Sequence, residues 1–409
     1  MFKEIYDMRK SLFFLLIISI LLVSCTTVGT SEPNPYLSTE VTPTQESTEV
    51  SQDSSVLLPL INIPLAEPTQ TPTPGPSKTP PPATYYIFEE GQNPLTGLAV
   101  SDPAILDRRP VMVKVSNWPR EGRPHAGLSK ADLVFEYFIG FQMNRFLAVY
   151  YGDNADRIGP VRSGRLVDAQ LAELYQGLLA YGNADPQVDE VLIDVLDERA
   201  LTFNELPCPS MCGQSTHSAT GVFANSSALS DYAAENGIKN QQPDLRGMYF
   251  QPEPPEGDAH GQLLRVEYAN FSIMEWRYDE ALGTYNLWME KEGSGGLEMG
   301  LMTDRNNNEA VAFENVIVMF AEYIEYAPSL HDIVLQSVQG YQPALLFRDG
   351  MINYATWRTP EADRPIVFET PDGRSLPLKP GKTWIVIVGQ ASRTTQPAGG
   401  EWTIYFDLP

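Results

Sequence analysis

Two arginines and a serine lie together in residues 159–165, which read Gly-Pro-Val-Arg-Ser-Gly-Arg. After them, apolar residues recur at intervals of three and four, which is the spacing of a helix packed on one side. These residues are Val167, Leu171, Leu174 and Leu178. We therefore expect a helix that begins at Arg162 and Arg165, with Ser163 as its N-cap after the Gly-Pro turn.

The start of this predicted helix suits an anion. The first turn of a helix has backbone N–H groups without partners and carries the positive end of the helix dipole. Arginine adds a planar fork of donors that matches phosphate or carboxylate. The alternative is that Arg162 and Arg165 pair with the protein's own carboxylates.

Further polar residues upstream extend the candidate site. We predict a ligand pocket formed by Arg145, Arg162, Arg165 and the polar loop 117–128, which includes Asn117 and Arg123. Aromatic side chains could stack on a sugar there, although such residues more often belong to the core. The candidates are Trp118, Tyr137 and Tyr181.

Two carboxylates, Asp132 and Glu136, are four residues apart on a predicted strand, so they are expected on the same face. They could form an acid pair or bind Ca²⁺. The interpretation we favour is that they are the ion-pair partners of Arg145, Arg162 and Arg165. On this basis we predict no metal site.

His217 lies in a small polar loop, residues 213–220, and is one of four histidines in the chain. An exposed histidine can act as a general acid or base at neutral pH, or simply make one structural hydrogen bond. The sequence has no phosphate-binding loop, dinucleotide fingerprint, nucleophile elbow or zinc-protease motif, so we predict no cofactor.

The first residues predict where the protein works. Residues 11–24 are an apolar run too short to span a bilayer, and basic residues precede them. The run ends in Leu-Val-Ser-Cys, which is typical of a bacterial lipoprotein signal in which Cys25 receives the lipid. We expect residues 1–25 to be this signal peptide. The alternatives are a single-pass anchor or a soluble secreted protein.

A Thr-, Pro- and Ser-rich segment, residues 26–87, follows the predicted signal. Its composition cannot bury enough apolar surface to offset the entropy of ordering, so we expect a disordered linker. Proline keeps such a tether extended. Residues 56–66 form an apolar interruption to which the sequence assigns no role.

The net charge disfavours one class of partner, and the cysteine content favours a disulfide. The net charge of −24 disfavours nucleic acid as a partner, because most of the surface repels a polyanion. Cys208 and Cys212 remain once Cys25 is assigned to lipid. An exported chain with such a pair favours a disulfide over a metal site, because His217 alone stands near them as a further ligand.

The rest of the chain predicts an α+β protein in two parts. Residues 88–250 alternate strands and helices, which predicts a mixed α/β domain. Residues 251–409 have a period of two and predict a smaller β-rich domain. The strands expected in the first part are 110–116, 133–139, 146–151, 179–181 and 201–203, with further helices at 187–196 and 226–236. Those expected in the second part include 315–320, 333–338 and 383–388.

Several motifs resemble those of the YerB-like family of bacterial lipoproteins. They are residues 93–98 (Asn-Pro-Leu-Thr-Gly-Leu), 145–148 (Arg-Phe-Leu-Ala), 159–165, 315–318 (Asn-Val-Ile-Val) and 378–385 (Leu-Lys-Pro-Gly-Lys-Thr-Trp-Ile). The resemblance implies an envelope lipoprotein with N-terminal and C-terminal domains and no established reaction. The chain departs from the family at His125-Ala126 and at the turn 140–144.

Two function classes follow. The first, which we favour, is a membrane-anchored lipoprotein on the extracytoplasmic face that binds an anionic wall polymer, a glycan or a protein partner through the arginine-lined pocket. The second is an envelope hydrolase or transferase that uses His217 as acid or base, with Arg162 and Arg165 stabilising negative charge.

Overall fold

The computed structural model describes residues 82–213 and 220–408. The predicted signal peptide with Cys25, most of the predicted linker, the apolar segment 56–66 and His217 lie outside the described residues. None of the described helices is long and apolar enough to cross a bilayer.

The central element is an 11-stranded sheet whose strands come from both parts of the described chain. Its order is β20 (Val367–Glu369), β19 (Met351–Arg358), β18 (Gln342–Arg348), β15 (Asn315–Ala321), β22 (Thr383–Gly389), β2 (Leu133–Gly140), β3 (Met143–Tyr150), β1 (Val111–Ser116), β4 (Leu178–Tyr181) and β5 (Ala200–Thr202), with β9 (Ala259–His260) paired to β19. Nearly every residue of β1, β2, β3 and β22 is buried, so both faces of this sheet are covered.

In a second, seven-stranded sheet, buried and less buried residues alternate as expected of a sheet with one solvent-exposed face. In β10, buried residues alternate with half-buried ones along the whole strand. The order is β13 (Met299–Leu301), β12 (Thr284–Glu290), β11 (Ser272–Asp279), β10 (Leu263–Ala269), β24 (Glu401–Tyr405) and β23 (Arg393–Ala398), with β14 (Ala312–Phe313) paired to β12.

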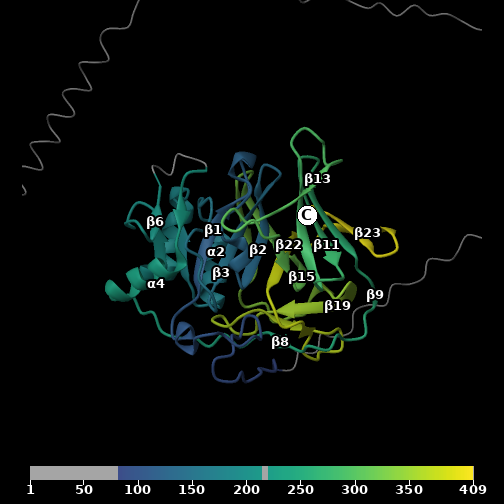
Figure 1. Ribbon diagram of the computed structural model, residues 1–409, viewed down its shortest axis with the longest axis horizontal. Coiled ribbons are helices and arrows are strands. Elements are labelled where there is room, and N and C mark those ends of the chain that lie inside the picture. The colour runs from purple at the N-terminus through teal and green to yellow at the C-terminus, as the bar shows by residue number, and fades with distance from the viewer. Residues whose placement is uncertain (1–81, 214–219, 409) are drawn as a thin grey trace, which may run out of the picture. The chain divides into compact units, whose positions relative to one another are not determined.

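Helices α2 (Leu166–Leu174) and α3 (Pro186–Leu196) cover one face of the large sheet, and α4 (Ser226–Glu235) and the second sheet cover the other. Leu171 and Leu192 belong to the first core. Leu229 of α4 and Trp276 of β11 belong to the second. Figure 1 shows α4 and the second sheet at opposite ends of the described body.

The remaining elements are short. Two-stranded pairs are β16 (Tyr323–Ala327) with β17 (Leu330–Ile333), β21 (Pro377–Leu378) with β8 (Tyr249–Phe250), and β6 (Met211–Cys212) with β7 (Phe223–Ala224). Single 3₁₀ turns are η1 (Pro103–Leu106), η2 (Arg120–Gly122), η3 (Leu128–Lys130) and η4 (Asp197–Arg199). Cys208 and Cys212 form a disulfide, with Cα atoms 4.8 Å apart.

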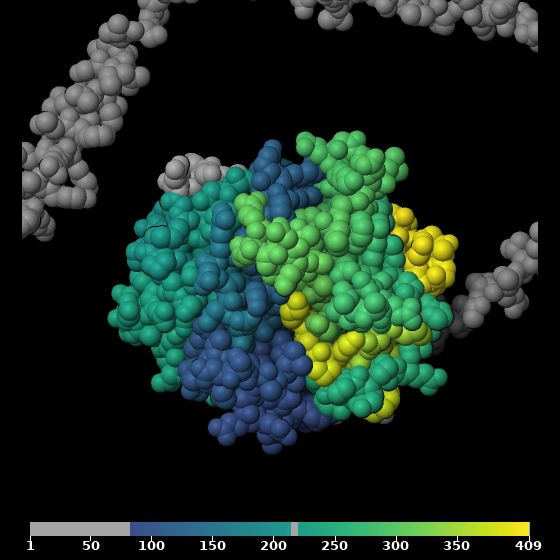
Figure 2. Space-filling view, viewed as in Figure 1, coloured from purple at the N-terminus to yellow at the C-terminus, as the bar shows by residue number. Residues whose placement is uncertain are grey.

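The two parts of the chain meet in the middle of the large sheet. β2 pairs in parallel with β22, from Leu133 opposite Thr383 to Tyr137 opposite Ile387. In Figure 2, early residues in blue border late residues in yellow and green along one continuous surface. The expected two-part organisation therefore takes a more β-rich form than an α/β domain followed by a β-rich one. The boundary predicted between residues 250 and 251 stays a prediction.

Candidate anion-binding site

The helix after the arginine motif begins where the arginines end. α2 starts at Leu166, and its N-cap is Arg165, whose backbone N–H donates to Asp168 Oδ2 at 2.7 Å. The prediction that Ser163 is the N-cap is wrong, because the Asp168 side chain supplies the capping acceptor instead. The Ser163 hydroxyl donates to Asn183 Oδ1 at 2.6 Å.

Arg145 reaches this motif from the large sheet. It lies on β3 opposite Tyr137, and only 8% of the residue is exposed. Its Nη1 donates to the Ser163 carbonyl oxygen at 2.8 Å, while Arg165 Nη1 donates to the Gly164 carbonyl oxygen at 2.9 Å. Backbone carbonyls thus hold both guanidinium groups in place.

Among the described residues no carboxylate forms an ion pair with these guanidinium groups, and the nearby Asp168 only partly offsets their charge. Arg145, Arg162 and Arg165 form no ion pair there, and the Nε atoms of Arg162 and Arg165 are buried without a hydrogen-bond partner. Burial lowers the pKa of Arg145 well below its usual value, and the positive charges of Arg165 and Arg162 lower it further. Such a cluster is costly in a folded protein, and an anion would relieve the cost.

A buried lysine lies beneath the arginines. Lys114 Nζ is 3.1 Å from Asp168 Oδ1, and Tyr137 O–H donates to the same oxygen. Burial lowers the pKa of Lys114 to about 7; Asp168 opposes this effect, and Arg145 and Arg165 add to it. Asp168 therefore serves both the lysine and the helix N-terminus. Neither Lys114 nor Asp168 stands out in the sequence; only the position of Asp168 in the first turn of the helix marks it as a possible capping residue.

An open cleft of about 690 Å³ adjoins Arg165. Its polar lining includes Ser163, Asn183 and Gln187, and Asp185 is its acidic residue. The other lining residues are Ala184, Pro186, Val188, Ala327, Ser329 and Leu330. The loop after β4, the start of α3 and the β16–β17 turn therefore form its walls.

The predicted partners of the arginines lie elsewhere. Asp132, just before β2, accepts hydrogen bonds from Asn93 Nδ2 at 2.9 Å and from the backbone N–H groups of Tyr151 and Gly152 at 2.6 and 3.0 Å. Burial raises its pKa to about 6. The interpretation that Asp132 pairs with the arginines is wrong, because backbone donors already occupy its oxygens.

Glu136 faces away from the arginines. On β2 it is adjacent to Tyr137, so its side chain points to the opposite face of the sheet. It accepts hydrogen bonds from Asn144 Nδ2 and Trp384 Nε1, both at 2.7 Å, and burial raises its pKa to about 7. Its predicted pairing with the arginines is also wrong.

Asn117 and Arg123 lie in the same polar cluster as Glu136 and Asn144. Arg123 donates to Asn117 Oδ1 at 3.1 Å and forms an ion pair with Glu290 at 3.0 Å, and Asn117 Nδ2 donates to Asn144 at 2.7 Å. Both residues therefore lie across the sheet from Arg145. The loop 117–128 does not join the arginine cleft.

The aromatic residues proposed for sugar stacking do not line the cleft either. Tyr137 and Tyr181 are completely buried, and the guanidinium groups of Arg120 and Arg123 cover the Trp118 ring. A different histidine lies near Arg165. His331 on β17 is 3.4 Å from Glu325. Burial lowers the pKa of His331, and the charge of Arg165 lowers it further.

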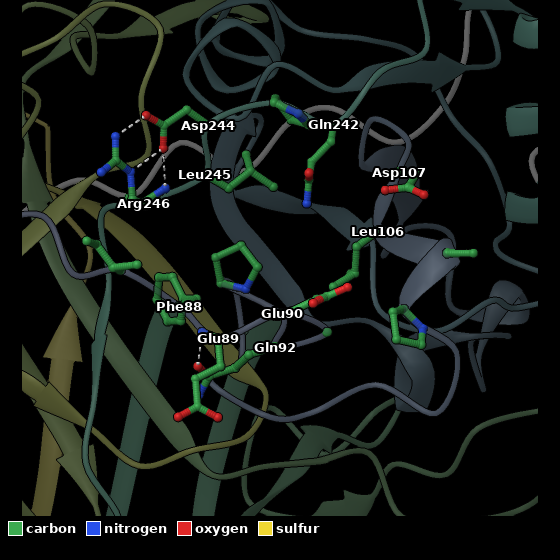
Figure 3. Close-up of a pocket in the computed structure, with 16 residues that line it drawn as sticks. Phe88, Glu89, Glu90, Gln92, Leu106, Asp107, Gln242, Asp244, Leu245 and Arg246 are labelled. Atoms are coloured by element: carbon green, nitrogen blue, oxygen red, sulfur yellow. Dashed lines mark hydrogen bonds and ion pairs between the residues drawn. The ribbon is translucent and has the colours of Figure 1, made fainter.

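Another cavity of about 700 Å³ lies between residues 87–107 and 242–246. Figure 3 shows the carboxylates of Glu89, Glu90 and Asp107 around it, with Asp244 held by Arg246. Its free charges are negative, so it does not suit an anion. In the described chain no group of three or more His, Cys, Asp or Glu residues could hold a metal ion.

Fold and site together define a β-rich protein in which two sequence domains share a sheet, with a cleft beside a cluster of buried arginines. Models described as "Protein of unknown function (DUF3048)", N-terminal and C-terminal domains, match residues 95–239 and 264–385. The chain belongs to this YerB-like family.

A relative from Bacillus subtilis (strain 168), named "Putative lipoprotein YerB", is 28% identical over 304 residues. The alignment covers 72% of this chain and 85% of the relative. The crystal structure of YerB protein from Bacillus subtilis is also similar, with a TM-score of 0.61 and 27% identity. That similarity covers 73% of this chain and 96% of the other. The predicted family resemblance is confirmed.

Proposed function

We propose that this protein is a lipoprotein, anchored to the extracytoplasmic face of the bacterial membrane, that binds an anionic envelope ligand through Arg145, Arg162 and Arg165. The name of the Bacillus subtilis relative and the signal-like residues 1–25 support the anchor. The observation that supports an anionic ligand is that none of the three arginines forms an ion pair with a carboxylate among the described residues.

The physical reason is charge balance. The protein is strongly acidic, so carboxylates are abundant, yet Arg145 and Arg165 are held by backbone carbonyls instead. A buried guanidinium without a counter-charge destabilises the folded state, and a bound anion would offset that destabilisation. The hydrolase or transferase alternative depends on His217, which lies outside the described residues, so it stays a prediction.

Replacing Arg162 with alanine tests the proposal. Arg162 makes no side-chain hydrogen bond with a described residue, so Arg162→Ala is expected to fold normally. Loss of one charged contact should weaken the binding of inorganic phosphate about tenfold, or ~1.4 kcal/mol. The measurement is the phosphate-dependent rise in unfolding temperature of the full-length chain in detergent, at constant ionic strength.

Arg374→Ala is the matched control, because Arg374 is an exposed arginine that pairs with Asp372 instead. It should respond to phosphate like the wild type. An equal response of Arg162→Ala and wild type, or no response in either, would contradict the proposed site.

A further inference from the structure

The cleft beside the arginines is much larger than one anion. Its volume of about 690 Å³ lies within the range of roughly 300–1,000 Å³ typical of small-molecule sites. Its lining includes Arg165 and two residues with side-chain amides, Asn183 and Gln187. A ligand that fills this cleft therefore has a neutral, hydrogen-bonding body attached to its anionic group.

We propose that the ligand is a phosphorylated sugar, with its phosphoryl group at Arg145, Arg162 and Arg165 and its hydroxyl groups on Ser163, Asn183 and Gln187. This inference rests on the proposed function and specifies its ligand.

Arg165 lines the cleft, and Arg145 and Arg162 lie behind it, close enough for the three charges to act on one another. Three guanidinium groups favour a phosphoryl group over a carboxylate. A carboxylate has two oxygens and is satisfied by a single guanidinium fork, whereas a phosphoryl group offers up to three terminal oxygens. Asp168 forms its ion pair with Lys114; its charge also raises the pKa values of Arg145 and Arg165, but it forms no ion pair with either of them. Asp185 is the carboxylate of the cleft lining, and it already caps α3 by accepting from the Gln187 N–H at 3.1 Å.

The amides are placed to bind hydroxyl groups. The Gly164 N–H donates to the Asn183 carbonyl at 2.8 Å, and the Gly182 N–H donates to the Arg162 carbonyl at 3.0 Å, so the two segments are held together. Asn183 Oδ1 accepts from Ser163, while its Nδ2 donates to no described residue. The Gln187 side chain likewise has no described partner. Amides both donate and accept, as a hydroxyl group requires.

The rest of the lining suits the C–H surface of a sugar. Pro186, Val188 and Leu330 are apolar, and no described lysine or arginine other than Arg165 lines this cleft. Positive charge in this lining is therefore confined to Arg165. This matches a molecule that carries its charge on a single group.

Isothermal titration of the full-length chain in detergent tests the proposal with four probes: glucose 1-phosphate, inorganic phosphate, glucuronate and glucose. Glucose 1-phosphate is expected to bind about tenfold more tightly than inorganic phosphate, and glucuronate and glucose more weakly than either. The methyl diester of glucose 1-phosphate separates two sources. Retained binding points to a phosphodiester-linked glycan, and lost binding to a free sugar phosphate.

The double substitution Asn183→Ala and Gln187→Ala should remove the tenfold preference and leave the affinity for inorganic phosphate unchanged. Asn236→Ala is the matched control, because this exposed residue follows α4 on the other face of the large sheet. If glucose 1-phosphate binds no better than phosphate, or the double variant keeps the preference, the sugar assignment fails while the anion site stands. If neither probe binds, both proposals fail.

Discussion

Replacing Arg145 with methionine is expected to weaken phosphate binding about 100-fold, or ~2.7 kcal/mol, and to make the unliganded protein more stable. Both effects have one cause. Arg145 is almost fully buried with no carboxylate partner among the described residues, so its charge destabilises the free protein and attracts a ligand. Methionine has a similar length, fits an irregular site and carries no charge.

The expected gain in the free energy of unfolding is about 1–2 kcal/mol, because replacing a buried charge by an apolar side chain is often stabilising. The loss of one hydrogen bond to Ser163, about 1 kcal/mol, is already included in this range. Urea unfolding without phosphate gives the stability, and titration with phosphate gives the affinity.

Arg199→Met provides the comparison, because Arg199 pairs with Glu173 near the end of α2. That variant should bind phosphate normally and gain no stability. If Arg145→Met is less stable than the wild type, the unliganded protein already compensates the charge of Arg145, which contradicts the prediction. Unchanged phosphate affinity would remove Arg145 from the site.

Replacing Asp168 with asparagine is expected to lower the free energy of unfolding by about 3–5 kcal/mol at pH 6. The carboxylate is the counter-charge of buried Lys114, and it also accepts the Arg165 N–H at the start of α2. Its removal leaves a buried ammonium group without a partner. The double variant Asp168→Asn with Lys114→Met should be at least ~1 kcal/mol more stable than Asp168→Asn alone.

The pH dependence of stability tests the same pair. The folded-state pKa of Lys114, about 7, lies below its unfolded value of 10.5. The folded protein therefore releases this proton first, and the lysine's contribution to stability rises as pH increases from about 7 towards 10. The slope from one group is at most ~1.4 kcal/mol per pH unit.

Lys114→Met should remove that rise, measured by urea unfolding at several pH values between 6 and 10. Lys130→Met is the control, because Lys130 is an exposed lysine paired with Asp153. If Lys114→Met and wild type have the same pH profile, the lysine is not the titrating group. An additive double-mutant cycle would likewise exclude coupling between Lys114 and Asp168.

Local periodicity was sufficient to predict many individual elements. The alternating or apolar runs at 315–320 and 383–388 correspond to β15 and β22, and the run at 187–196 corresponds to α3. The strand predicted at 333–338 is largely wrong, because β17 ends at Ile333. The pairing of β2 with β22 could not be predicted, since parallel partners about 250 residues apart leave no local pattern.

The site was predicted less completely than the fold. The arginine motif is contiguous, so Arg162 and Arg165 could be grouped from their spacing. The partners of Asp132 and Glu136 could not be predicted from the sequence. Asp132 is bound by backbone N–H groups, and the Glu136 side chain lies on the face of the sheet opposite the arginines. Asp168 and Lys114 are 54 residues apart and meet only in the folded structure.

The pairing of β2 with β22 also has a consequence for how the newly synthesised chain folds. Until Thr383–Gly389 has been synthesised, one edge of β2 lacks its neighbour and the early strands cannot complete their core. Ribosomal synthesis takes place from the N-terminus, so β2 must wait for about 250 further residues before its parallel partner exists. Such sequence-distant pairing slows folding, because the entropy of closing a long loop is lost before the contacts form.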